Sequence, residues 1–307
     1  MTMTKPYSGL FPVAPTPFTD DGDVDFDGQR RVLDCMIDQG VDGICILANY
    51  SEQFLLSDDE RRALTELCLD HIGESVPVMV TCSHFSTQIA CARAAHAAER
   101  GAKLIMMMPP YHGAGIRLDE TTMYDHFARV AEAAQVPVMI QDAPLSGVSL
   151  SVEFLVRIAR TLPLVRYFKI EVAGTAAKLR KLIELGGDAI EGPFDGEEAI
   201  TLMADLDAGA TGVMSSALLP DLIHAVIKHH HAGRRPEAAA AYQRILPLIN
   251  YENRQCGLRA AKTVMVEGGV IKSDHVRHPL EPMSPATRAG LLELARDAGP
   301  LALRWGK

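Results

Sequence analysis

Two short apolar runs, PVMVT at Pro77–Thr81 and LIMMM at Leu104–Met108, decide the fold class of this chain. Apolar residues follow one another in both runs instead of alternating with polar ones, which is the pattern of parallel strands buried on both faces. The stretch between them is longer and amphipathic, and Gly101 stands where a helix should end. The two runs therefore predict a strand–helix–strand unit of an α/β fold.

Six more short runs repeat this pattern along the chain: Gly9–Pro15, Gly43–Leu47, Pro137–Gln141, Val165–Ile170, Ala189–Gly192 and Gly212–Ser216. Helical stretches separate them, and one begins with the capping box Ser57-Asp58-Asp59-Glu60. Strand, helix and loop recur about every 25 to 30 residues, so that eight units fill residues 9–232. The sequence predicts a (β/α)8 TIM barrel, because a doubly wound sheet would carry a Gly-rich phosphate loop that this sequence lacks.

The remaining residues, 235–307, predict three additional C-terminal helices packed on the barrel: Pro236–Ile249, Glu252–Glu267 and Pro285–Asp297. No linker separates these helices from the barrel in the sequence. We therefore expect residues 1–307 to form a single domain.

Composition and charge narrow the possible partners. The 307 residues carry 30 Lys plus Arg against 39 Asp plus Glu, a net charge of −9, so a broad basic surface for nucleic acid or membrane lipid is not expected. The six cysteines show no CxxC spacing, and His229–His231 lie where a helix should end before Gly233, so neither group predicts a metal site. With no signal peptide and no apolar run long enough to span a bilayer, the sequence predicts a cytoplasmic protein with reduced cysteines.

Lys169 is the first candidate for chemistry. The active site of a barrel lies at the C-terminal ends of its strands, and Lys169 is the one lysine of nine inside a predicted central strand. Burial disfavours the ammonium form, and a lysine pushed toward neutrality is a nucleophile that forms a Schiff base with a ketone. Glu171 follows on the same face of the strand, so an ordinary ion pair between the two residues is an equal alternative on position alone.

Motifs at the ends of the predicted strands give the chain a family resemblance. They are Thr16-Pro17-Phe18, Ala48-Asn49-Tyr50-Ser51-Glu52, Met108-Pro109-Pro110-Tyr111, Gln141-Asp142-Ala143-Pro144, Phe168-Lys169-Ile170, Gly196-Glu197-Glu198 and, in the tail, Arg277-His278-Pro279-Leu280. In order and spacing they resemble the dihydrodipicolinate synthase and N-acetylneuraminate lyase family over nearly the whole chain. The resemblance implies a Schiff-base barrel that acts on a 2-oxo acid through Lys169 and is usually assembled as a homotetramer, a dimer of dimers.

Two residues depart from the family members that make or break carbon–carbon bonds. Tyr50 stands where those members carry the second Thr of Gly-Thr-Thr-Gly-Glu, and Gln141 stands where they carry the Tyr of Tyr-Asn-x-Pro. In those members the Thr and the Tyr relay protons. A glutamine exchanges no proton at neutral pH, so the relay is lost and the sequence argues against aldol cleavage.

Carboxylates at the expected rim of the barrel suit an elimination instead. Removing an α-proton with a base and protonating a leaving hydroxyl with an acid each contributes ~10² to 10⁴ in rate. Glu171 and Glu198 are the candidate pair, with Glu198 in the family's Gly-Asp-Asp motif. Glu197 and Glu198 could equally open the next helix, where carboxylates suit the helix dipole, and Glu191 could be a structural contact in the seventh strand.

Taken together, the segments Ile46–Phe54 and Phe168–Glu171 resemble the branch of the family that dehydrates 2-keto-3-deoxy sugar acids, most closely L-2-keto-3-deoxyarabonate. The implied product is 2-oxoglutarate semialdehyde, formed without a metal or an organic cofactor after Lys169 binds the C2 ketone. Three alternatives remain open: a 2-keto-3-deoxy acid aldolase, an imino-acid deaminase of hydroxyproline breakdown, and a catalytically silent regulator that binds a 2-oxo acid. Gln141 argues against the first of these and Lys169 against the last.

The resemblance also implies where the substrate binds. Backbone N–H and hydroxyl groups after the second strand would hold its carboxylate, which suits an acidic protein because no mobile cation is added. Tyr111 matches a tyrosine that reaches into a neighbouring subunit's site, with interface packing as the alternative. The predicted substrate-binding residues are Asn49, Tyr50, Ser51, Tyr111, Gln141 and Ser215.

Overall fold

The computed structural model describes residues 6–111, 118–143 and 146–307, which divide into two compact units. The first unit contains residues 6–9, 77–197 and 201–214, and the second unit contains residues 10–76, 198–200 and 215–307. The single domain expected from the sequence stays a prediction. Pro144, which belongs to the motif after the fifth strand, and the first five residues of the chain lie outside the described residues.

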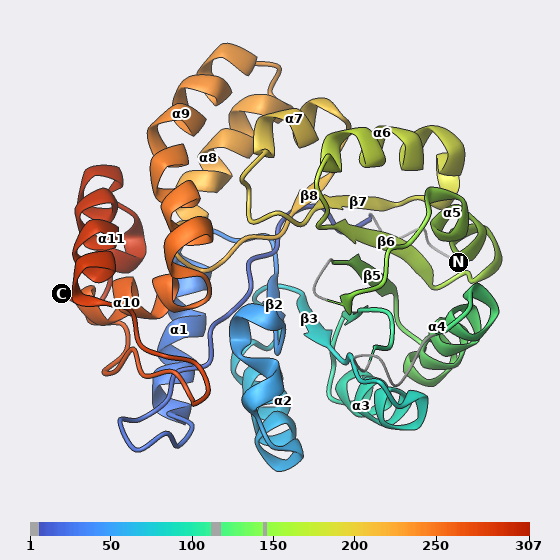
Figure 1. The fold of residues 1–307 in the computed structure, drawn as a ribbon, viewed down its shortest axis with the longest axis horizontal. Helices are drawn as coiled ribbons and strands as arrows, with labels where there is room; N and C mark the ends of the chain where they lie inside the picture. Colours follow the sequence, from blue (N-terminus) through green and yellow to red (C-terminus); the bar gives the residue numbers. More distant parts are fainter. Residues whose placement is uncertain (1–5, 112–117, 144–145) are drawn as a thin grey trace. The chain divides into compact units, whose positions relative to one another are not determined.

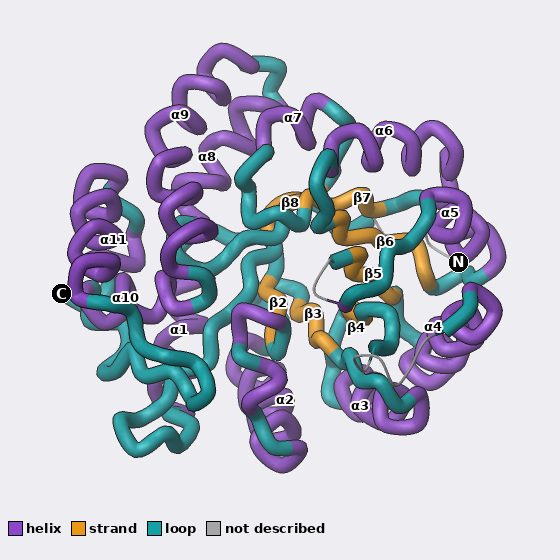
Figure 2. The backbone as a smooth tube through the Cα atoms, viewed as in Figure 1, coloured by secondary structure: helices purple, strands orange, loops and turns teal. Residues whose placement is uncertain are grey.

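The first unit is built on six parallel strands within its described residues, and each strand pairs with the next one along the chain. They are β3 (Val78–Thr81), β4 (Leu104–Met107), β5 (Val138–Asp142), β6 (Val165–Ile170), β7 (Gly192–Asp195) and β8 (Gly212–Val213). The helices of this unit are α3 (Thr87–Glu99), α4 (Glu120–Ala134), α5 (Val152–Thr161), α6 (Thr175–Gly186) and α7 (Leu202–Asp207). Figure 1 shows α3, α4, α5 and α6 along the outer side of these strands, and the tube in Figure 2 shows the same arrangement.

Burial on both faces explains the continuous apolar runs of this unit. Every residue of β3, β4 and β5 is buried, as expected where both faces of a strand are covered. Full burial of one large apolar side chain stabilises a fold by ~1.5 to 3 kcal/mol. The register of β5 on β6 places Gln141 beside Lys169, and the register of β6 on β7 places Lys169 beside Phe194. The sheet thus brings Gln141 and Lys169 together at the ends of neighbouring strands.

The second unit is mainly helical in its described residues. Its elements are β2 (Ile44–Ile46), α1 (Phe26–Asp38), α2 (Asp58–Ile72), α8 (Pro220–His231), α9 (Arg235–Tyr251), α10 (Arg259–Glu267) and α11 (Pro285–Ala298), and β1 (Gly9–Leu10) spans the boundary between the units in the sequence. Val13 forms parallel bridges to Cys45 and to Ser216. The predicted capping box opens α2, with reciprocal hydrogen bonds between Ser57 and Glu60. Among the described residues of the first unit, the strands of the sheet follow the order β8-β7-β6-β5-β4-β3.

The seventh strand lies later in the chain than predicted. Strand β7 covers Gly192–Asp195, whereas residues 187–189 form a 3₁₀ turn, so the predicted strand Ala189–Gly192 is wrong. Proline lacks the N–H of a ladder bond and is therefore disfavoured inside strands, but here the Pro193 carbonyl joins the ladder by accepting the Thr211 N–H at 2.9 Å. Glu191 consequently lies outside the strand, where its carboxylate is 2.5 Å from the Arg166 guanidinium.

The C-terminal region differs from the prediction at its second helix. Helices α9 and α11 agree with the predicted first and third helices, but the single helix expected over Glu252–Glu267 is wrong. Residues Glu252–Cys256 form a π-helix, and α10 begins only at Arg259. Gly257 separates the two with a φ of 60°, a left-handed conformation that glycine adopts without steric cost.

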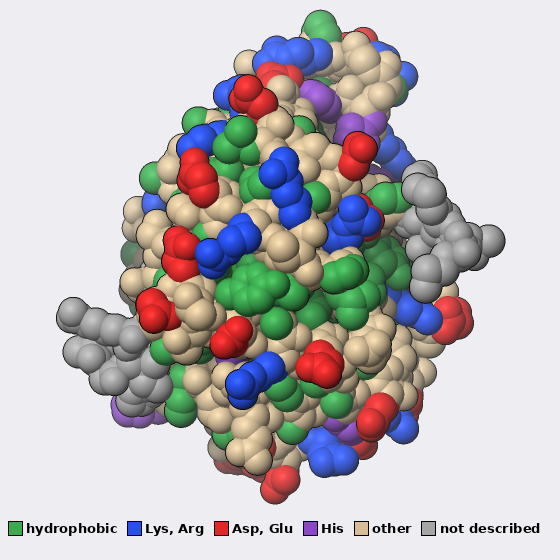
Figure 3. Space-filling model, turned by 90° about the vertical axis from the view of Figure 1, so that its right-hand side faces the viewer, with side chains coloured by type: hydrophobic (Ala, Val, Ile, Leu, Met, Phe, Trp, Pro, Cys, Tyr) green, Lys and Arg blue, Asp and Glu red, His purple; other side chains and the backbone are tan. Residues whose placement is uncertain are grey.

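Four further features bear on the sequence predictions. No helix in the residues that the structure describes combines the length and the hydrophobicity needed to cross a bilayer. All six cysteines belong to the described part and are free thiols. His229–His231 end α8 as predicted. On the face drawn in Figure 3, acidic and basic side chains are interspersed around hydrophobic ones.

Candidate active site

Lys169 lies on β6 and is only 2% exposed. Its Nζ atom is 3.1 Å from Oε2 of Glu171, two residues further along the chain on the same face of the strand. The ion pair that the sequence left open is therefore present. The contact also places a carboxylate next to the nitrogen that would react with a ketone. It is therefore compatible with a Schiff-base role for Lys169 as well.

Gln141 supplies a second contact to Glu171. Its Nε2 atom donates a hydrogen bond of 2.8 Å to Oε2 of Glu171, the same oxygen that faces Lys169. Gln141 is 1% exposed, and its Oε1 atom has no hydrogen-bond partner among the residues that the structure describes. An amide side chain moves no proton, so in this contact Gln141 orients the carboxylate beside Nζ.

Gly196 allows the stem of Lys169 to pass beside the end of β7. A Cβ atom on Gly196 would stand 2.7 Å from Cγ of Lys169 and 2.9 Å from the Ile170 carbonyl oxygen. Close-packed interiors do not accommodate contacts this short, so a larger residue would displace the lysine stem or the backbone of β6. The glycine of the Gly-Glu-Glu motif is thus explained by the approach of Lys169.

A second ion pair fixes the end of β5. Asp142 is 1% exposed and lies 2.5 Å from Nζ of Lys178, which also donates to the Leu150 carbonyl at 2.6 Å. The Asp142 carbonyl accepts the Glu171 N–H at 2.9 Å, so this pair supports the backbone of Glu171. Lys178 has no signal in the sequence, because it lies 36 residues from Asp142 along the chain and no local pattern joins them.

A cluster of carboxyl groups beside β7 was not predicted from the sequence either. Asp195, the last residue of that strand, has no exposed surface, and burial together with the nearby charge of Asp205 raises the pKa of its carboxyl to about 8. Its Oδ1 atom accepts the Glu197 N–H at 2.9 Å. Burial likewise raises the pKa of Asp205 to about 6, while its Oδ2 atom accepts a 2.5 Å hydrogen bond from the Thr201 hydroxyl. These contacts fix the first residues after β7.

The Asp195 carboxyl should make stability depend on pH in a defined direction. The folded protein keeps this proton up to about pH 8, whereas an unfolded chain releases it near the ordinary value of 3.8. The folded state therefore binds more protons between these values, and stability falls as pH rises through them. The charged groups acting on this carboxyl are Asp205, Glu197 and Lys169. We expect the difference in Tm, Asp195→Asn minus wild type, to increase as the pH is raised from about 5 to about 9.

Thermal melts of both proteins across this range measure the difference. Asp125→Asn, at an exposed carboxylate of the same unit, is the matched control and should give a constant offset in Tm. Burial also raises the pKa of Glu252 to about 8, but that contribution is common to all three proteins and cancels. An Asp195→Asn offset that stays constant would mean that Asp195 titrates in its ordinary range.

In the second unit, Glu198 is 5% exposed and lies in a strained turn. The backbone angle φ is 54° at Glu198 and 65° at Ala199, in the left-handed region that residues with a Cβ atom seldom adopt. The hypothesis that Glu197 and Glu198 open the next helix is wrong, because α7 begins only at Leu202. Strained backbone concentrates at functional sites, so the turn favours a chemical role for Glu198.

The segment after β2 forms a 3₁₀ turn over Asn49–Ser51, the predicted site of the substrate carboxylate. The Ser51 hydroxyl donates to the Ala14 carbonyl at 2.6 Å and accepts the Ala48 N–H at 3.1 Å. These hydrogen bonds hold the turn in place before any ligand binds. Binding of a carboxylate by this turn stays a prediction.

Lys262 is a second buried lysine, and it lies in the second unit. Its Nζ atom is 2.5 Å from Oε1 of Glu52, 2.5 Å from the His275 carbonyl oxygen and 3.2 Å from the Thr16 carbonyl oxygen. Burial lowers the pKa of Lys262, whereas the charge of Glu52 opposes that shift. A carboxylate and two carbonyls surround the amine, so Lys262 is a structural anchor of the segment after β2 and no candidate for the Schiff base.

Two predicted substrate contacts lie in different units. Tyr111, in the first unit, is half-buried, and burial raises the pKa of its hydroxyl. Ser215, in the second unit, is 1% exposed, and its hydroxyl donates to the Ser216 carbonyl at 2.9 Å. Contact of either residue with a substrate stays a prediction.

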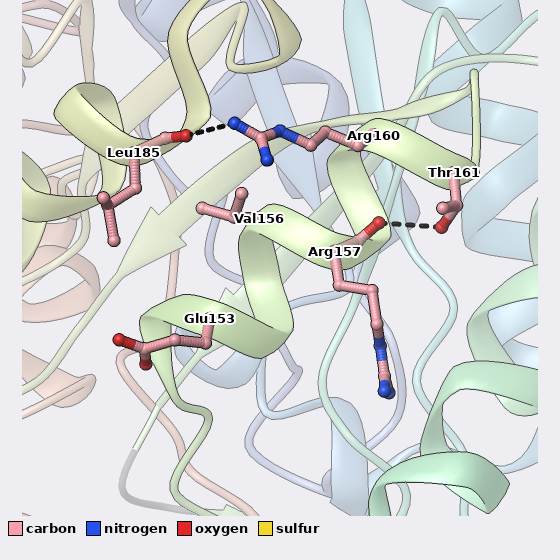
Figure 4. A pocket seen from close by; sticks show the side chains of 6 residues that line it. All are labelled: Glu153, Val156, Arg157, Arg160, Thr161 and Leu185. Atoms are coloured by element: carbon pink, nitrogen blue, oxygen red, sulfur yellow. Dashed lines mark hydrogen bonds between the residues drawn. The ribbon is translucent and has the colours of Figure 1, made fainter.

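A hollow of about 440 Å³ on α5 offers no competing site. Figure 4 shows its lining, in which Arg160 donates to the Leu185 carbonyl and the Thr161 hydroxyl to the Arg157 carbonyl. These polar groups therefore satisfy backbone carbonyls in the last turns of α5 and α6. Within the described ranges of the chain, no group of three or more His, Cys, Asp or Glu side chains is arranged to hold a metal ion. Lys169 and its neighbours remain the candidate active site.

Comparison with known proteins identifies the family of the chain. The model of the dihydrodipicolinate synthetase family matches residues 6–297. The L-2-keto-3-deoxyarabonate dehydratase of Azospirillum brasilense is 54% identical over 302 residues, 98% of each chain. The 4-hydroxy-tetrahydrodipicolinate synthase of Methanothrix thermoacetophila is 28% identical over 291 residues, 94% of this chain and 96% of that one.

Solved structures confirm the fold. A prophage protein of the dihydrodipicolinic acid synthase family from E. coli K12, solved in complex with pyruvate, has a TM-score of 0.89 at 25% identity and covers 96% of this chain and 99% of its own. The dihydrodipicolinate synthase of Aquifex aeolicus has a TM-score of 0.88 at 22% identity and covers 96% and 98%. The predicted α/β barrel with C-terminal helices is thus confirmed. The chain belongs to the dihydrodipicolinate synthetase family.

Proposed function

We propose that this protein dehydrates L-2-keto-3-deoxyarabonate to 2-oxoglutarate semialdehyde, and that Lys169 forms a Schiff base with the C2 ketone. One observation carries the proposal. Oε2 of Glu171 lies 3.1 Å from Nζ of Lys169 and accepts the Gln141 amide at 2.8 Å, so Gln141, which replaces the relay tyrosine of aldol-cleaving relatives, holds a carboxylate beside the lysine. The 54% identity to the Azospirillum brasilense dehydratase supports the choice of substrate.

Covalent catalysis begins when the neutral amine of Lys169 adds to C2. The carbinolamine loses water and leaves an iminium that draws electrons from C3, so that the C3 protons become acidic. The iminium itself is the electron sink, and this route therefore needs no metal or organic cofactor. Glu171 lies 3.1 Å from Nζ and is held there by the Gln141 amide, so the carboxylate sets the orientation in which C3 is presented.

Elimination then breaks two bonds, C3–H and C4–O. The electrons of the C–H bond form the C3=C4 double bond, and the hydroxyl departs as water after receiving a proton. We assign these two proton transfers to Glu171 and Glu198. Removal of a C5 proton and return of one to C3 give an enol, which becomes the aldehyde, and hydrolysis releases Lys169 and the semialdehyde. The net change is the loss of one water molecule.

Product analysis tests this function. Supplied with L-2-keto-3-deoxyarabonate, the protein should release the semialdehyde and at most traces of pyruvate, because Gln141 cannot relay the proton that aldol cleavage requires. Four-, five- and six-carbon 2-keto-3-deoxy acids, assayed for both products, give the preferred chain length. Pyruvate as the main product would establish an aldolase, and the absence of any product would favour a binding protein.

We also propose that the protein acts in the cytoplasm as a homotetramer, with Tyr111 close to a subunit interface. The family resemblance motivates the tetramer, whose mass light scattering measures. The six free cysteines suit a reducing compartment.

A further inference from the structure

The turn that carries Glu198 contains two consecutive residues with a left-handed backbone. The angle φ is 54° at Glu198 and 65° at Ala199. In this region the Cβ atom crowds the backbone carbonyl, so a chain seldom adopts it twice in succession. Contacts from outside the turn must therefore keep it in this conformation.

Tyr242 provides such contacts. It lies on α9 and is 9% exposed, and its hydroxyl is 3.1 Å from the Ala199 carbonyl oxygen and also bonds to the Ile200 carbonyl. A phenol has one proton, which the two carbonyls share. Because the direction of a carbonyl fixes ψ of its own residue, this hydroxyl fixes the backbone immediately after Glu198.

The chain is also held immediately before Glu198. The Glu197 N–H donates to Oδ1 of Asp195, which ends β7. Glu198 itself is 5% exposed. Hydrogen bonds therefore fix the short turn on both sides of Glu198. The direction of the Glu198 carboxylate depends on both sets of hydrogen bonds.

We propose that Tyr242 is a positioning residue for the elimination. Its hydroxyl keeps the turn in the left-handed conformation and so aims the Glu198 carboxylate, without itself moving a proton to the substrate. The role rests on the proposed function, since it acts through Glu198. Formation of the imine on Lys169 does not require it.

A Tyr242→Phe variant removes the hydroxyl and keeps the ring. We expect kcat for semialdehyde formation to fall ~10-fold or more, because misplacing a reacting group by about 1 Å costs up to ~10² in rate. KM should stay within about twofold of wild type, and so should the rate at which pyruvate and borohydride label Lys169. This split between chemistry and imine formation distinguishes positioning of Glu198 from a general loss of structure.

Two further variants sharpen the test. Tyr251→Phe removes a hydroxyl on the same helix, 3.4 Å from the Thr287 carbonyl, and should keep the wild-type kcat. Ala199→Gly, combined with Tyr242→Phe, should restore part of the lost kcat, because glycine adopts a positive φ without strain. An unchanged kcat in Tyr242→Phe, or no recovery in a folded double variant, overturns the positioning role.

The failure of this role and the failure of the proposed function give different results. A wild-type protein that makes no semialdehyde from L-2-keto-3-deoxyarabonate contradicts the function. A wild type that makes it, together with a fully active Tyr242→Phe variant, contradicts the positioning role alone. Added to Glu198→Gln, Tyr242→Phe should cause little further loss, since both act through one carboxylate, and a multiplied loss would overturn the proposal.

Discussion

A Lys169→Arg variant should show no turnover and no labelling by pyruvate and borohydride. Arginine keeps a positive charge next to Glu171, but the guanidinium stays protonated and forms no imine. Every later step of the proposed reaction follows the covalent intermediate, so the expected loss of kcat is complete within detection. Intact-mass analysis after reduction measures the label, and a semialdehyde assay measures the turnover.

Lys178→Arg is the matched control for this experiment. Lys178 also lies in the first unit and pairs with a buried carboxylate, Asp142, at 2.5 Å. Arginine can keep that ion pair, so the variant should still be labelled at Lys169. Turnover by Lys169→Arg would contradict the Schiff-base mechanism, and persistent labelling of that variant would assign the imine to another lysine.

Replacing Glu171 or Glu198 with Gln should slow elimination by ~10² or more and leave imine formation intact. Glutamine keeps the size and much of the hydrogen bonding of the side chain but has no proton to exchange. With pyruvate and borohydride both variants should be labelled at Lys169. With L-2-keto-3-deoxyarabonate they should accumulate the covalent complex and release little semialdehyde, which quenched intact-mass measurements show directly.

Glu153→Gln controls for the loss of a charge, because Glu153 is exposed and pairs with Lys181 at 2.6 Å. It should retain wild-type kcat. A Glu198→Gln variant with the parental rate would remove Glu198 from the mechanism, leaving Tyr50 as the next candidate, because Arg166 already engages Glu191. If Glu171→Gln fails to form the imine, Glu171 acts earlier, in dehydration of the carbinolamine.

The parts of the site that local sequence patterns determine were predictable. Lys169 stands out because a lysine buried in a central strand is costly unless it has a function or a partner. The period of two along that strand placed Glu171 on its face, and the structure has the two side chains 3.1 Å apart. The apolar runs themselves predicted the strands, because burial on both faces leaves few polar positions.

Other parts depend on contacts that no local pattern encodes. Lys262 and Glu52 are 210 residues apart in the chain, and Tyr242 is 43 residues from Ala199. The bounds of the seventh strand depend on such contacts too, because the Pro193 carbonyl in β7 accepts the N–H of Thr211, just before the next strand. The raised pKa of Asp195 likewise follows from burial and from Asp205 on another element, which only the folded chain brings close.

Borohydride reduction during turnover of L-2-keto-3-deoxyarabonate, followed by mass analysis of the peptide that contains Lys169, tests the proposed mechanism most directly. One spectrum reports both where the substrate is attached and what has happened to its carbon chain. We predict a five-carbon adduct on Lys169 that has lost the C4 oxygen as water. A three-carbon adduct with the skeleton of pyruvate would instead show carbon–carbon cleavage and contradict the dehydratase, and an unlabelled Lys169 would contradict the Schiff base.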